Sequence, residues 1–591
     1  MFVSATAESG TAPEAGVEAL ATIASAVADA PETQAVANAI SDPSAPPNVV
    51  TDVVSKVLSS VGLNPFASDN PVAPVDSPAM WAMLAWARKQ EDVAGPSSFG
   101  RMFGDLEPLN QQTNEQLRLE AQKMLEEQPA IANPKGTTGG ITFFGQFIDH
   151  DLTLDTLPQP DAPVDVNTLV NGRTFAFDLD SVYGGGPKKS PQLYNGDKFL
   201  IGTATDGVSP DLPRNADGSA ILVEHRNDEN LIIAQIHLSF LKLHNSLIDQ
   251  GMSFDQARQT VIGAYRYVVL NDYLPQIVGQ EAVNQALRQP VKAGFYDPGK
   301  GTPFTPVEFS VAAFRFGHSQ IRNAYNINDA SGGVPVFSLD GTADLHGGRQ
   351  LPANLIIDFD NFFSELPQDG GPLLIGRAID TNISQSLFQL PIPGAEGGGD
   401  NVLAFRNLLR AKFYDMPSGE AVAEAMGVDV VGDPLFPEGT PLWFYILREA
   451  EITSGGAELG PVGGGIVAEV FVDLLRQDSG YKTVEKPNLA DVSGGDFRIG
   501  DLLVAADQPV EERPQPPAAE PCRDRDGRPT PGRAHEGSGR HRFDQLHRAD
   551  ERALERSGRH RLHQQLHRAD DLVLERSGRH RLHQQLHGAD N

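Results

Sequence analysis

The chain has 591 residues, of which 40% are hydrophobic, and a formal net charge of −31. That length can bury a large core, and the excess of carboxylates argues against nucleic acid and anionic membranes as partners. The single cysteine, Cys522, excludes an intrachain disulfide and a zinc site built from thiolates.

The sequence carries no familiar targeting segment. No basic stretch followed by an apolar core opens the chain, so we expect no conventional signal peptide. No uninterrupted apolar run of 18 residues occurs, which predicts that the chain has no membrane span. The acidic composition suits a calcium-rich extracellular medium, so we expect secretion by a route that needs no signal peptide, with a cytoplasmic location as the alternative.

Four regions follow one another along the chain. Residues 1–76, rich in Ala, Ser, Pro and Asp, are expected to form a flexible extension. Residues 77–507 are predicted to form one large, irregular, mainly α-helical domain, and residues 508–537 a Pro-rich linker. Residues 538–591 are rich in Arg and His and repeat Ser-Gly-Arg-His. They lack the large apolar residues of a core and are predicted to be disordered, with a metal- or anion-binding repeat as the alternative.

The helices of the central domain are predicted from apolar residues that recur with a period near 3.6. The first is expected to start at Ser77-Pro78, a good N-cap and first helical residue, and another at Ser418. Further helices are predicted at 140–151, 230–249, 254–273, 309–323, 402–414, 441–449 and 462–475. Few stretches alternate with period two, which indicates little β-structure.

The segment from 145 to 153, Gly-Gln-Phe-Ile-Asp-His-Asp-Leu-Thr, contains the first candidate site. On a helix Gln146 and His150 share one face, because they are four residues apart, and Asp149 and Asp151 flank it. Such polarity beside the apolar run 141–148 indicates a buried site, since burying these groups without partners is costly. The alternative is a helix end with solvated charges and a surface histidine.

A second segment offers oxygen ligands at even spacing. Thr174, Asp178 and Asp180 provide side-chain oxygens, and the backbone carbonyl of Ala176 lies between them. Several hard oxygen ligands suit Ca²⁺ better than Mg²⁺, and Asp151 of the first segment would complete the shell. An Asp-rich turn without a metal is the alternative.

Three further residue groups have a functional and a structural interpretation each. Arg226 and Glu229 precede a long helix, where a solvated, charged helix start is the simpler explanation. His318 follows Gly317 late in an apolar helix, where a core histidine is the usual finding. Asn407 lies among apolar neighbours, where it would hydrogen-bond an imidazole or cap part of the core.

In their order along the chain, these motifs resemble the peroxidase–cyclooxygenase superfamily, the animal haem peroxidases, which includes myeloperoxidase, peroxidasin and many bacterial members. The resemblance spans about residues 85–505. The motifs that carry it are Gly145-Gln-x-x-Asp-His-Asp, the loop from Thr174 to Gly184, Arg226-x-x-Glu229, Ile236-His237 with His244-Asn245, Arg315-Phe-Gly-His318, Arg406-Asn407-Leu-Leu-Arg410, the Pro-Leu-Trp-Phe-Tyr run from Pro441 and the Gly-rich run from Leu459.

The resemblance implies a role for each candidate residue. On the proximal side of haem b, His318 would ligate the iron and Asn407 would accept its ring N–H. On the distal side, His150 would be the acid/base, Arg226 the cation that stabilises negative charge, and Gln146 the halide or water contact. Asp149 and Glu229, on the same side, match the carboxylates that can form ester links to haem methyl groups in this family. The matching calcium ligands are Asp151, Thr174, Ala176 (backbone), Asp178 and Asp180. His237 and His244 are expected to be structural.

The chemistry of these side chains agrees with a peroxidase. A neutral imidazole can take a proton from peroxide and return it to the departing oxygen, and a guanidinium favours charge on that oxygen. We therefore expect a haem peroxidase that reduces hydrogen peroxide through the family's oxyferryl intermediate and oxidises a halide, thiocyanate or a small organic donor.

Departures from the family pattern keep two alternatives in view. Asn230 stands where myeloperoxidase has the methionine of its sulfonium link, so that link is not expected. Arg315 stands where fatty-acid oxygenases have a radical tyrosine, which disfavours a fatty-acid dioxygenase. A non-catalytic calcium-binding adhesion or matrix protein is the other alternative, although it would have no chemical need for His150, His318 and Arg226 together.

Overall fold

The computed structural model describes residues 97–507 with gaps at 110–111, 126–129, 156–162, 290–293, 297–302, 329–330, 339–343, 364–374, 391–400, 438, 478–485, 488 and 490–495. By its backbone contacts the chain divides into two compact units, Met1–Pro509 and Val510–Asn591. All described residues belong to the first unit. The predicted extension at 1–76, the helix expected after Ser77 and the tail at 538–591 lie outside the described residues.

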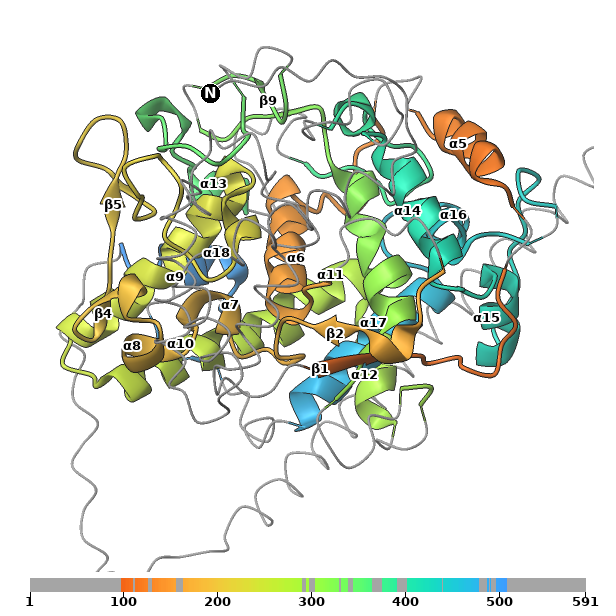
Figure 1. Cartoon of the computed structure of the whole chain (residues 1–591), viewed down its shortest axis with the longest axis horizontal. Helices are drawn as coiled ribbons and strands as arrows, with labels where there is room; N and C mark the ends of the chain where they lie inside the picture. The colour runs from red at the N-terminus through yellow and green to blue at the C-terminus, as the bar shows by residue number, and fades with distance from the viewer. Residues whose placement is uncertain are drawn as a thin grey trace, which may run out of the picture. The chain divides into compact units, whose positions relative to one another are not determined.

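The described part is mainly helical, which confirms the predicted fold class (Figure 1). Its centre holds α6 (Gly139–Leu152), which packs against α9 (Leu231–Asp249). The rings of Phe147 on α6 and Phe240 on α9 stack with centroids 4.8 Å apart. Gly145 is required on α6, because a Cβ at this position would lie 2.2 Å from the Tyr273 hydroxyl oxygen. These contacts hold the face that carries Gln146 and His150 against the core.

Helix α10 (Phe254–Val268) runs into a π-helical turn, η4 (Val269–Tyr273), before α11 (Leu274–Val278). The sequence predicts one helix over 254–273. The structure is helical throughout this range, but the last turn is π-helical and therefore wider than an α-helical turn. The predicted helix at 309–323 differs more. Its residues form a π-helical segment, η5 (Glu308–Ala312), and a 3₁₀ segment, η6 (Ala313–Gln320), which carries His318.

Two helices, α16 (Leu442–Ser454) and α17 (Pro461–Gln477), pack against η6, and α14 (Leu403–Phe413) packs against η5. Trp443 of α16 is fully buried, and its indole N–H donates to the backbone oxygen of Arg315 at 3.2 Å. The proximal segment is therefore fixed from behind by a large apolar residue.

The remaining helices are shorter or peripheral. They are α5 (Asn114–Lys123), α7 (Asp180–Tyr183), α8 (Gly186–Lys189), α12 (Gln280–Arg288), α13 (Phe359–Phe362), α15 (Gly419–Met426), α18 (Ile499–Val504), and the 3₁₀ turns η1 (Val166–Thr168), η2 (Pro191–Leu193), η3 (His225–Asp228), η7 (Ala353–Leu355) and η8 (Gln385–Phe388). The Ser418 hydroxyl accepts the Ala421 N–H at 3.1 Å, so α15 begins with the predicted cap.

The described strands are short. β1 (Ser97–Gly100) pairs antiparallel with β2 (Val170–Asn171) and parallel with β7 (Thr305–Pro306). Three further antiparallel pairs are β3 (Tyr194–Asn195) with β4 (Lys198–Phe199), β5 (Gly202–Thr203) with β6 (Pro210–Asp211), and β8 (Ala324–Tyr325) with β9 (Val334–Pro335). Because β1 pairs with both β2 and β7, it connects the segment just before Thr174 with the segment just before η5. Both segments lead into the candidate site.

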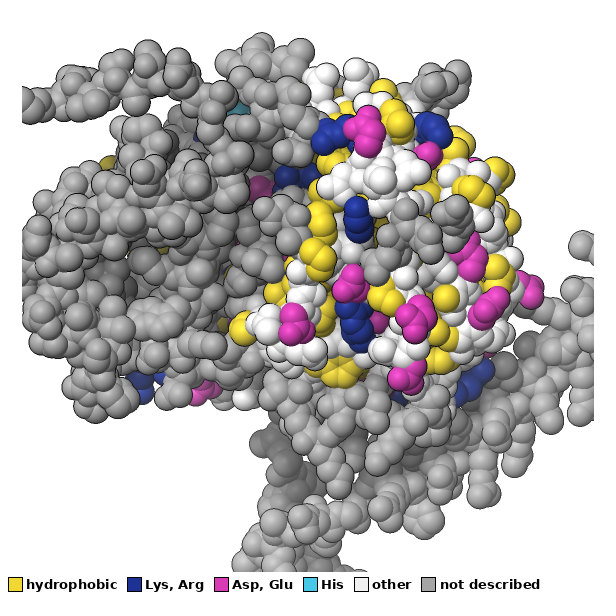
Figure 2. Space-filling view, turned by 45° about the vertical axis from the view of Figure 1, so that its right-hand side comes forward, with side chains coloured by type: hydrophobic (Ala, Val, Ile, Leu, Met, Phe, Trp, Pro, Cys, Tyr) yellow, Lys and Arg dark blue, Asp and Glu magenta, His cyan; other side chains and the backbone are white. Residues whose placement is uncertain are grey.

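One described helix, α9, has the length and apolar composition to cross a membrane, and 78% of its most apolar window is buried inside the protein. A core helix of a soluble protein passes the same test, and α9 has such a place against α6 and α10. On one face of the described surface, acidic and basic side chains alternate with small apolar areas (Figure 2).

Candidate active site

His150 lies near the end of α6 and is 4% exposed. Its Nδ1 atom is 2.9 Å from Oδ1 of Asn227, which belongs to η3. Burial, reinforced by the positive charge of Arg226, lowers the pKa of His150 to about 3. The imidazole is therefore neutral near pH 7, as an acceptor of protons must be.

The other predicted distal residues gather around this imidazole. The Gln146 amide N–H donates to Oε1 of Glu229, and the same amide's oxygen accepts a hydrogen bond from Asn230 at 3.2 Å. Oε1 of Glu229 lies 3.9 Å from Nε2 of His150. Asn230 also caps α9 by accepting the backbone N–H groups of residues 232 and 233. Asn230 thus has a structural role as the cap of α9.

Arg226 reaches the same region from η3. Its guanidinium donates to the backbone oxygens of His150 (3.4 Å) and Thr153 (2.5 Å), and Nη1 lies 4.0 Å from Oδ2 of Asp149. Burial alone would lower the pKa of Arg226, but the charges of Glu224 and Asp149 raise it above its ordinary value. The side chain is a permanent cation and keeps 24% of its surface exposed.

A buried ionic chain behind Arg226 was not predicted. Glu224 is 1% exposed and accepts the Arg226 Nε–H at 3.0 Å on one oxygen and the Arg173 Nε–H at 2.9 Å on the other. Nη1 of Arg173 then lies 3.5 Å from Oδ1 of Asp180. Burial opposes the charge of Glu224, but the two arginines hold its pKa well below the usual range. These carboxylates and arginines connect the distal side to the acidic cluster.

The side chains of His318 and Asn407 lie within hydrogen-bond distance of each other. Nδ1 of His318 on η6 is 2.8 Å from Nδ2 of Asn407 on α14. The prediction had the amide oxygen accept the ring N–H, whereas the amide nitrogen faces the ring here. A half-turn of the amide exchanges the two atoms. Burial, with a smaller effect of the Arg315 charge, lowers the pKa of His318 to about 3, so the ring is neutral and able to ligate a metal.

Proximal and distal elements lie next to each other. The hydroxyl of Thr142 on α6 is 3.5 Å from Oε1 of Gln320 on η6. A Cβ added to Gly317 would find only the Thr142 methyl group, at the ordinary contact distance of 3.8 Å. The charge of Arg315 acts on both His318 and Asp149. The segment that carries His318 therefore lies in contact with the helix that carries His150, and the backbone at Gly317 has one close neighbour among the described side chains, the Thr142 methyl group.

Arg315 and Arg410 lie on the two elements that carry His318 and Asn407, and sequence reasoning did not assign them a role. Burial and the neighbouring charge of Arg410 lower the pKa of Arg315 to about 10. Arg410 itself donates to Oδ2 of Asp155 and lies 3.1 Å from the Tyr414 hydroxyl. Asp155 is far along the chain from both arginines, and no charge pattern surrounds Arg315. The sequence therefore gives no signal that these arginines, Asp155 and Tyr414 lie together.

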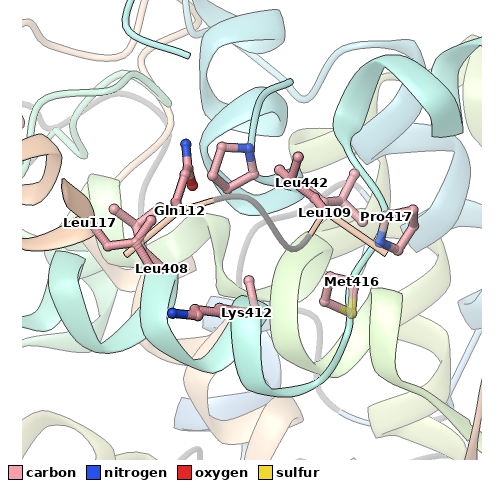
Figure 3. A pocket seen from close by; sticks show the side chains of 10 residues that line it. Leu109, Gln112, Leu117, Leu408, Lys412, Met416, Pro417 and Leu442 are labelled. Carbon is pink, nitrogen blue, oxygen red and sulfur yellow. The ribbon is translucent and has the colours of Figure 1, made fainter. Parts of the chain in front are cut away.

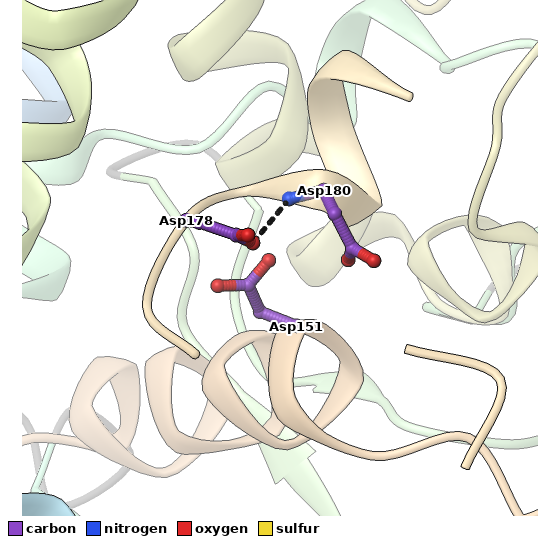
Figure 4. A group of neighbouring side chains, drawn as sticks. All are labelled: Asp151, Asp178 and Asp180. Carbon is purple, nitrogen blue, oxygen red and sulfur yellow. Dashed lines mark hydrogen bonds between the residues drawn. The ribbon is translucent and has the colours of Figure 1, made fainter. Parts of the chain in front are cut away.

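The predicted calcium ligands converge on one point. The carboxylates of Asp151, Asp178 and Asp180 each offer an oxygen within 4.8 Å of the others (Figure 4). The Thr174 hydroxyl donates to both oxygens of Asp178, at 2.9 and 3.0 Å, and the Ala176 carbonyl accepts the Asp178 N–H at 3.0 Å. All five predicted ligands are thus gathered in one place.

The charge of this cluster favours a cation. Burial and the neighbouring carboxylates raise the pKa of Asp151 well above its usual value, and burial with Asp180 raises that of Asp178 to about 7. Three clustered carboxylates that repel one another, two of them buried, would be stabilised by a hard cation that prefers oxygen ligands, as calcium does. Leu179 between them has a positive φ of 55°, a strained conformation that keeps the loop tightly turned.

A surface pocket elsewhere is separate from this chemistry. It lies between α5, α14 and α16 (Figure 3). Its lining is apolar apart from two side chains: Leu109, Gln112, Leu117, Leu408, Ala411, Lys412, Met416, Pro417, Pro441 and Leu442. It contains no histidine or carboxylate, so it offers no acid–base chemistry.

Comparison with known proteins points to one family. Residues 156–340 match the family model described as animal haem peroxidase. This range contains Thr174, Arg226 and His318, whereas His150 and Asn407 lie outside it. The chain is similar to a chorion peroxidase of Aedes aegypti, with 31% identity over 299 residues, 47% of this chain and 36% of that protein. It is similar to heme peroxidase 2 of Caenorhabditis elegans, with 30% identity over 285 residues, 43% of this chain and 39% of that protein.

A thyroid peroxidase of Sus scrofa is 25% identical over 377 residues, 52% of this chain and 38% of that protein. The chain thus spans well under half the length of these curated relatives. Among solved structures, peroxidase A from Dictyostelium discoideum has a TM-score of 0.46 and 19% identity, covering 66% of this chain and 90% of that one. The fatty acid alpha-dioxygenase of Oryza sativa has a TM-score of 0.46 and 16% identity, covering 66% and 77%.

Proposed function

We propose that this chain is a haem-dependent peroxidase, because residues 156–340 match the animal haem peroxidase family model and the chain is similar to several peroxidases. It would reduce hydrogen peroxide and oxidise a halide, thiocyanate or a small organic donor. The observation that carries the proposal is the pair of neutral histidines, His318 held by Asn407 and His150 beside Arg226, on adjacent elements.

The residues of the proximal side fit haem. The imidazole of His318 offers Nε2, for which the described residues provide no hydrogen-bond partner, while Nδ1 is held by Asn407. The buried guanidinium groups of Arg315 and Arg410 would balance the negative charges of the porphyrin carboxylates, an interaction that arginine forms in two parallel hydrogen bonds. When bound, haem would supply the redox-active iron at which peroxide is reduced.

The distal residues would handle the protons of peroxide. His150 takes a proton at Nε2 from the attacking oxygen and returns it to the oxygen that departs, which is worth roughly 10²–10⁴ in rate. Arg226 favours negative charge on the departing oxygen. Its hydrogen bonds to two backbone oxygens fix the guanidinium in advance, so that it need not move during the reaction. Gln146 orients a water or halide between these groups.

Asp149 and Glu229 are the carboxylates that we propose as ester links to haem. Glu229 is half exposed at 50%, and Asp149 keeps 29% of its side chain exposed, so both present oxygens outside the packed core. Burial raises the pKa of Asp149 above its usual value, so conversion to a neutral ester would remove an unfavourable charge.

We also propose that calcium binds at Asp151, Thr174, Ala176, Asp178 and Asp180, and that the protein is secreted. The acidic cluster supports the metal site, and the acidic composition with a calcium requirement suits an extracellular setting. A non-catalytic calcium-binding protein would share the cluster but would not bind haem or react with peroxide. A fatty-acid dioxygenase would need a radical tyrosine where this chain has Arg315.

Absorption spectra of three variants test the peroxidase proposal. His318→Ala should lose the Soret band, because it removes the iron ligand. His150→Gln should keep the band and lose peroxide turnover, because it removes only the proton acceptor. His346→Ala, a partly exposed histidine bound to Asp344, is the matched control and should keep both. An unchanged Soret band in His318→Ala would refute the proposal.

A further inference from the structure

Behind His150 lies a second buried histidine, joined to it by one amide. Oδ1 of Asn227 is 2.9 Å from Nδ1 of His150, and Nδ2 of the same side chain is 3.0 Å from Nδ1 of His237. All three side chains are almost inaccessible, at 4%, 0% and 1% exposed. His237 belongs to α9 and Asn227 to η3, so three separate elements meet in this contact.

We propose that His237 is a positioning residue that sets the tautomer of His150 through Asn227. The proposal goes beyond the expectation that His237 is structural, and it rests on the proposed function of His150 as the proton acceptor. His237 does not touch substrate. It acts by deciding which ring nitrogen of His150 carries the proton.

The argument follows from counting donors and acceptors. An amide has one end that only accepts and one that only donates, and a neutral imidazole has one nitrogen of each kind. With Oδ1 turned to His150, that ring must hold its proton on Nδ1, which leaves a lone pair on Nε2. With Nδ2 turned to His237, that ring must accept at Nδ1 and hold its proton on Nε2.

The opposite arrangement reverses both rings together. A half-turn of the Asn227 amide would place Nδ2 against His150, so His150 would hold its proton on Nε2 and could not accept one there. The same half-turn would place Oδ1 against His237, which would then need its proton on Nδ1. The two tautomers are therefore linked, because either mismatch would leave an unpaired polar group among buried side chains, which is costly.

The surroundings keep His237 neutral. Burial lowers its pKa to about 3, and the ring of Phe147 lies against it with centroids 6.4 Å apart. His237 is therefore uncharged near pH 7, and only the position of its ring proton, its tautomer, can change. On the distal side Oε1 of Glu229, which accepts the Gln146 amide N–H, lies 3.9 Å from Nε2 of His150, too far to accept a hydrogen bond from a proton on that nitrogen.

The nitrogen shifts of the two rings test the proposal without peroxide turnover. The full chain, labelled with ¹⁵N-histidine and loaded with diamagnetic zinc protoporphyrin, is compared with Asn227→Leu and Asn227→Asp by two-bond ¹⁵N–¹H correlation. His150→Gln and His237→Gln assign the signals. Asn133→Leu is the control, because it removes a buried amide that bonds only to the backbone, at residues 135, 456 and 457.

In the wild type we expect a protonated Nδ1 on His150 and a protonated Nε2 on His237. Asn227→Leu should move both nitrogens of each ring toward averaged shifts, and Asn133→Leu should leave them unchanged. Asn227→Asp, which only accepts, should restore the His150 pattern and move the His237 proton to Nδ1. Second-order reaction of the haem-loaded protein with peroxide should fall about 10- to 100-fold in Asn227→Leu and recover in Asn227→Asp.

A proton on Nε2 of wild-type His150, or unchanged shifts in Asn227→Leu, overturns the proposal. These outcomes are separable from failure of the proposed function. A chain that binds zinc protoporphyrin and shows the linked tautomers, but does not react with peroxide when loaded with haem, would refute the peroxidase and leave the tautomer coupling standing.

Discussion

The distal and proximal sides of the site are built on different principles. On the distal side, several polar groups bind one another: Gln146 donates to Glu229, and Arg226 donates to Glu224 and to the backbone of α6. On the proximal side, the polar partner of His318 in the described part of the chain is Asn407, and its segment η6 packs against α16 and α17, with the Trp443 indole bonded to the Arg315 backbone. The distal side has to place several protons and charges at once, whereas the proximal side has to present one nitrogen.

The difference predicts where substitutions are most damaging to folding. A network of buried charges fails when one member is removed, because the remaining charges lose their partners. A histidine held by packing tolerates the loss of its one polar contact better, since the apolar contacts remain. Four measurements test this contrast, from the largest expected effect to the smallest.

Glu224→Ala should lower the free energy of unfolding by about 3–5 kcal/mol, because Arg173 and Arg226 would lose their buried carboxylate. Chemical denaturation measures this change. Glu281→Ala is the control: Glu281 pairs with Arg288 on the surface, with 80% and 70% of the side chains exposed, and its loss should cost less than about 1 kcal/mol. Equal effects of the two substitutions would contradict a distal side held together by charge.

Calcium removal should lower the melting temperature, because binding at about 100–1,000 times the Kd stabilises by about 3–4 kcal/mol. The pKa of Asp178 is about 7 without the metal, so calcium affinity should fall as the pH drops below 7 and protons compete for the site. Calorimetry with and without a chelator at pH 6 and 8 measures both effects. Asp178→Asn should remove most of the calcium response, and a full response in this variant would exclude the site.

The two sides should also respond oppositely to pH. Glu449 of α16 is fully buried and accepts the N–H groups of Val462 and Gly463, and burial raises its pKa to about 7. A folded-state pKa above the unfolded value near 4.3 means that its contribution is greatest at low pH and is lost as the pH rises through 7.

The depressed pKa of Glu224 on the distal side has the opposite sign, so its contribution is present at neutral pH and lost in acid. Unfolding free energies measured from pH 5 to 8 for wild type and Glu449→Gln should differ in slope, by a total of no more than about 3 kcal/mol. Parallel curves would show that Glu449 does not titrate in this range.

Asn407→Leu should have the smallest effect on folding. It removes one hydrogen bond from His318, so we expect weaker haem retention by about 10- to 100-fold and little change in the melting temperature of the haem-free chain. Competition for haem with a globin apoprotein measures retention. Asn133→Leu removes an amide that bonds to the backbone and not to His318, so it should leave retention unchanged. Loss of folding in Asn407→Leu would show that the proximal side depends on polar contacts as the distal side does.

The sequence predicts regular features of this fold well and long-range pairing poorly. The predicted helices at 140–151, 230–249 and 402–414 agree with α6, α9 and α14 within one residue at each end, because apolar periodicity is a local signal. The segment 309–323 is irregular, because Ala312 leaves helical geometry with φ −126° and ψ −72°, which no local pattern announces.

The same limit applies to the site. Gln146, His150 and the calcium ligands were predicted from their spacing and from a family resemblance, and the structure gathers each group. Arg173 and Glu224 are 51 residues apart in sequence, and only the fold shows that they bind each other. His237 looked like a core histidine from its place on an apolar helix, and its partner Asn227 was not recognised as a link between two imidazoles.

The helix at the far end of the described chain has a consequence for biogenesis. α18 packs against α9, α10 and α13, and its first residue, Ile499, donates its N–H to Asp272 at 2.9 Å. A ribosome releases this helix only after almost all of the other described elements have emerged. Until residues 499–504 are synthesised, the apolar surfaces of α9, α10 and α13 that α18 covers stay exposed on the nascent chain. A chaperone that binds apolar surface would bind there during synthesis.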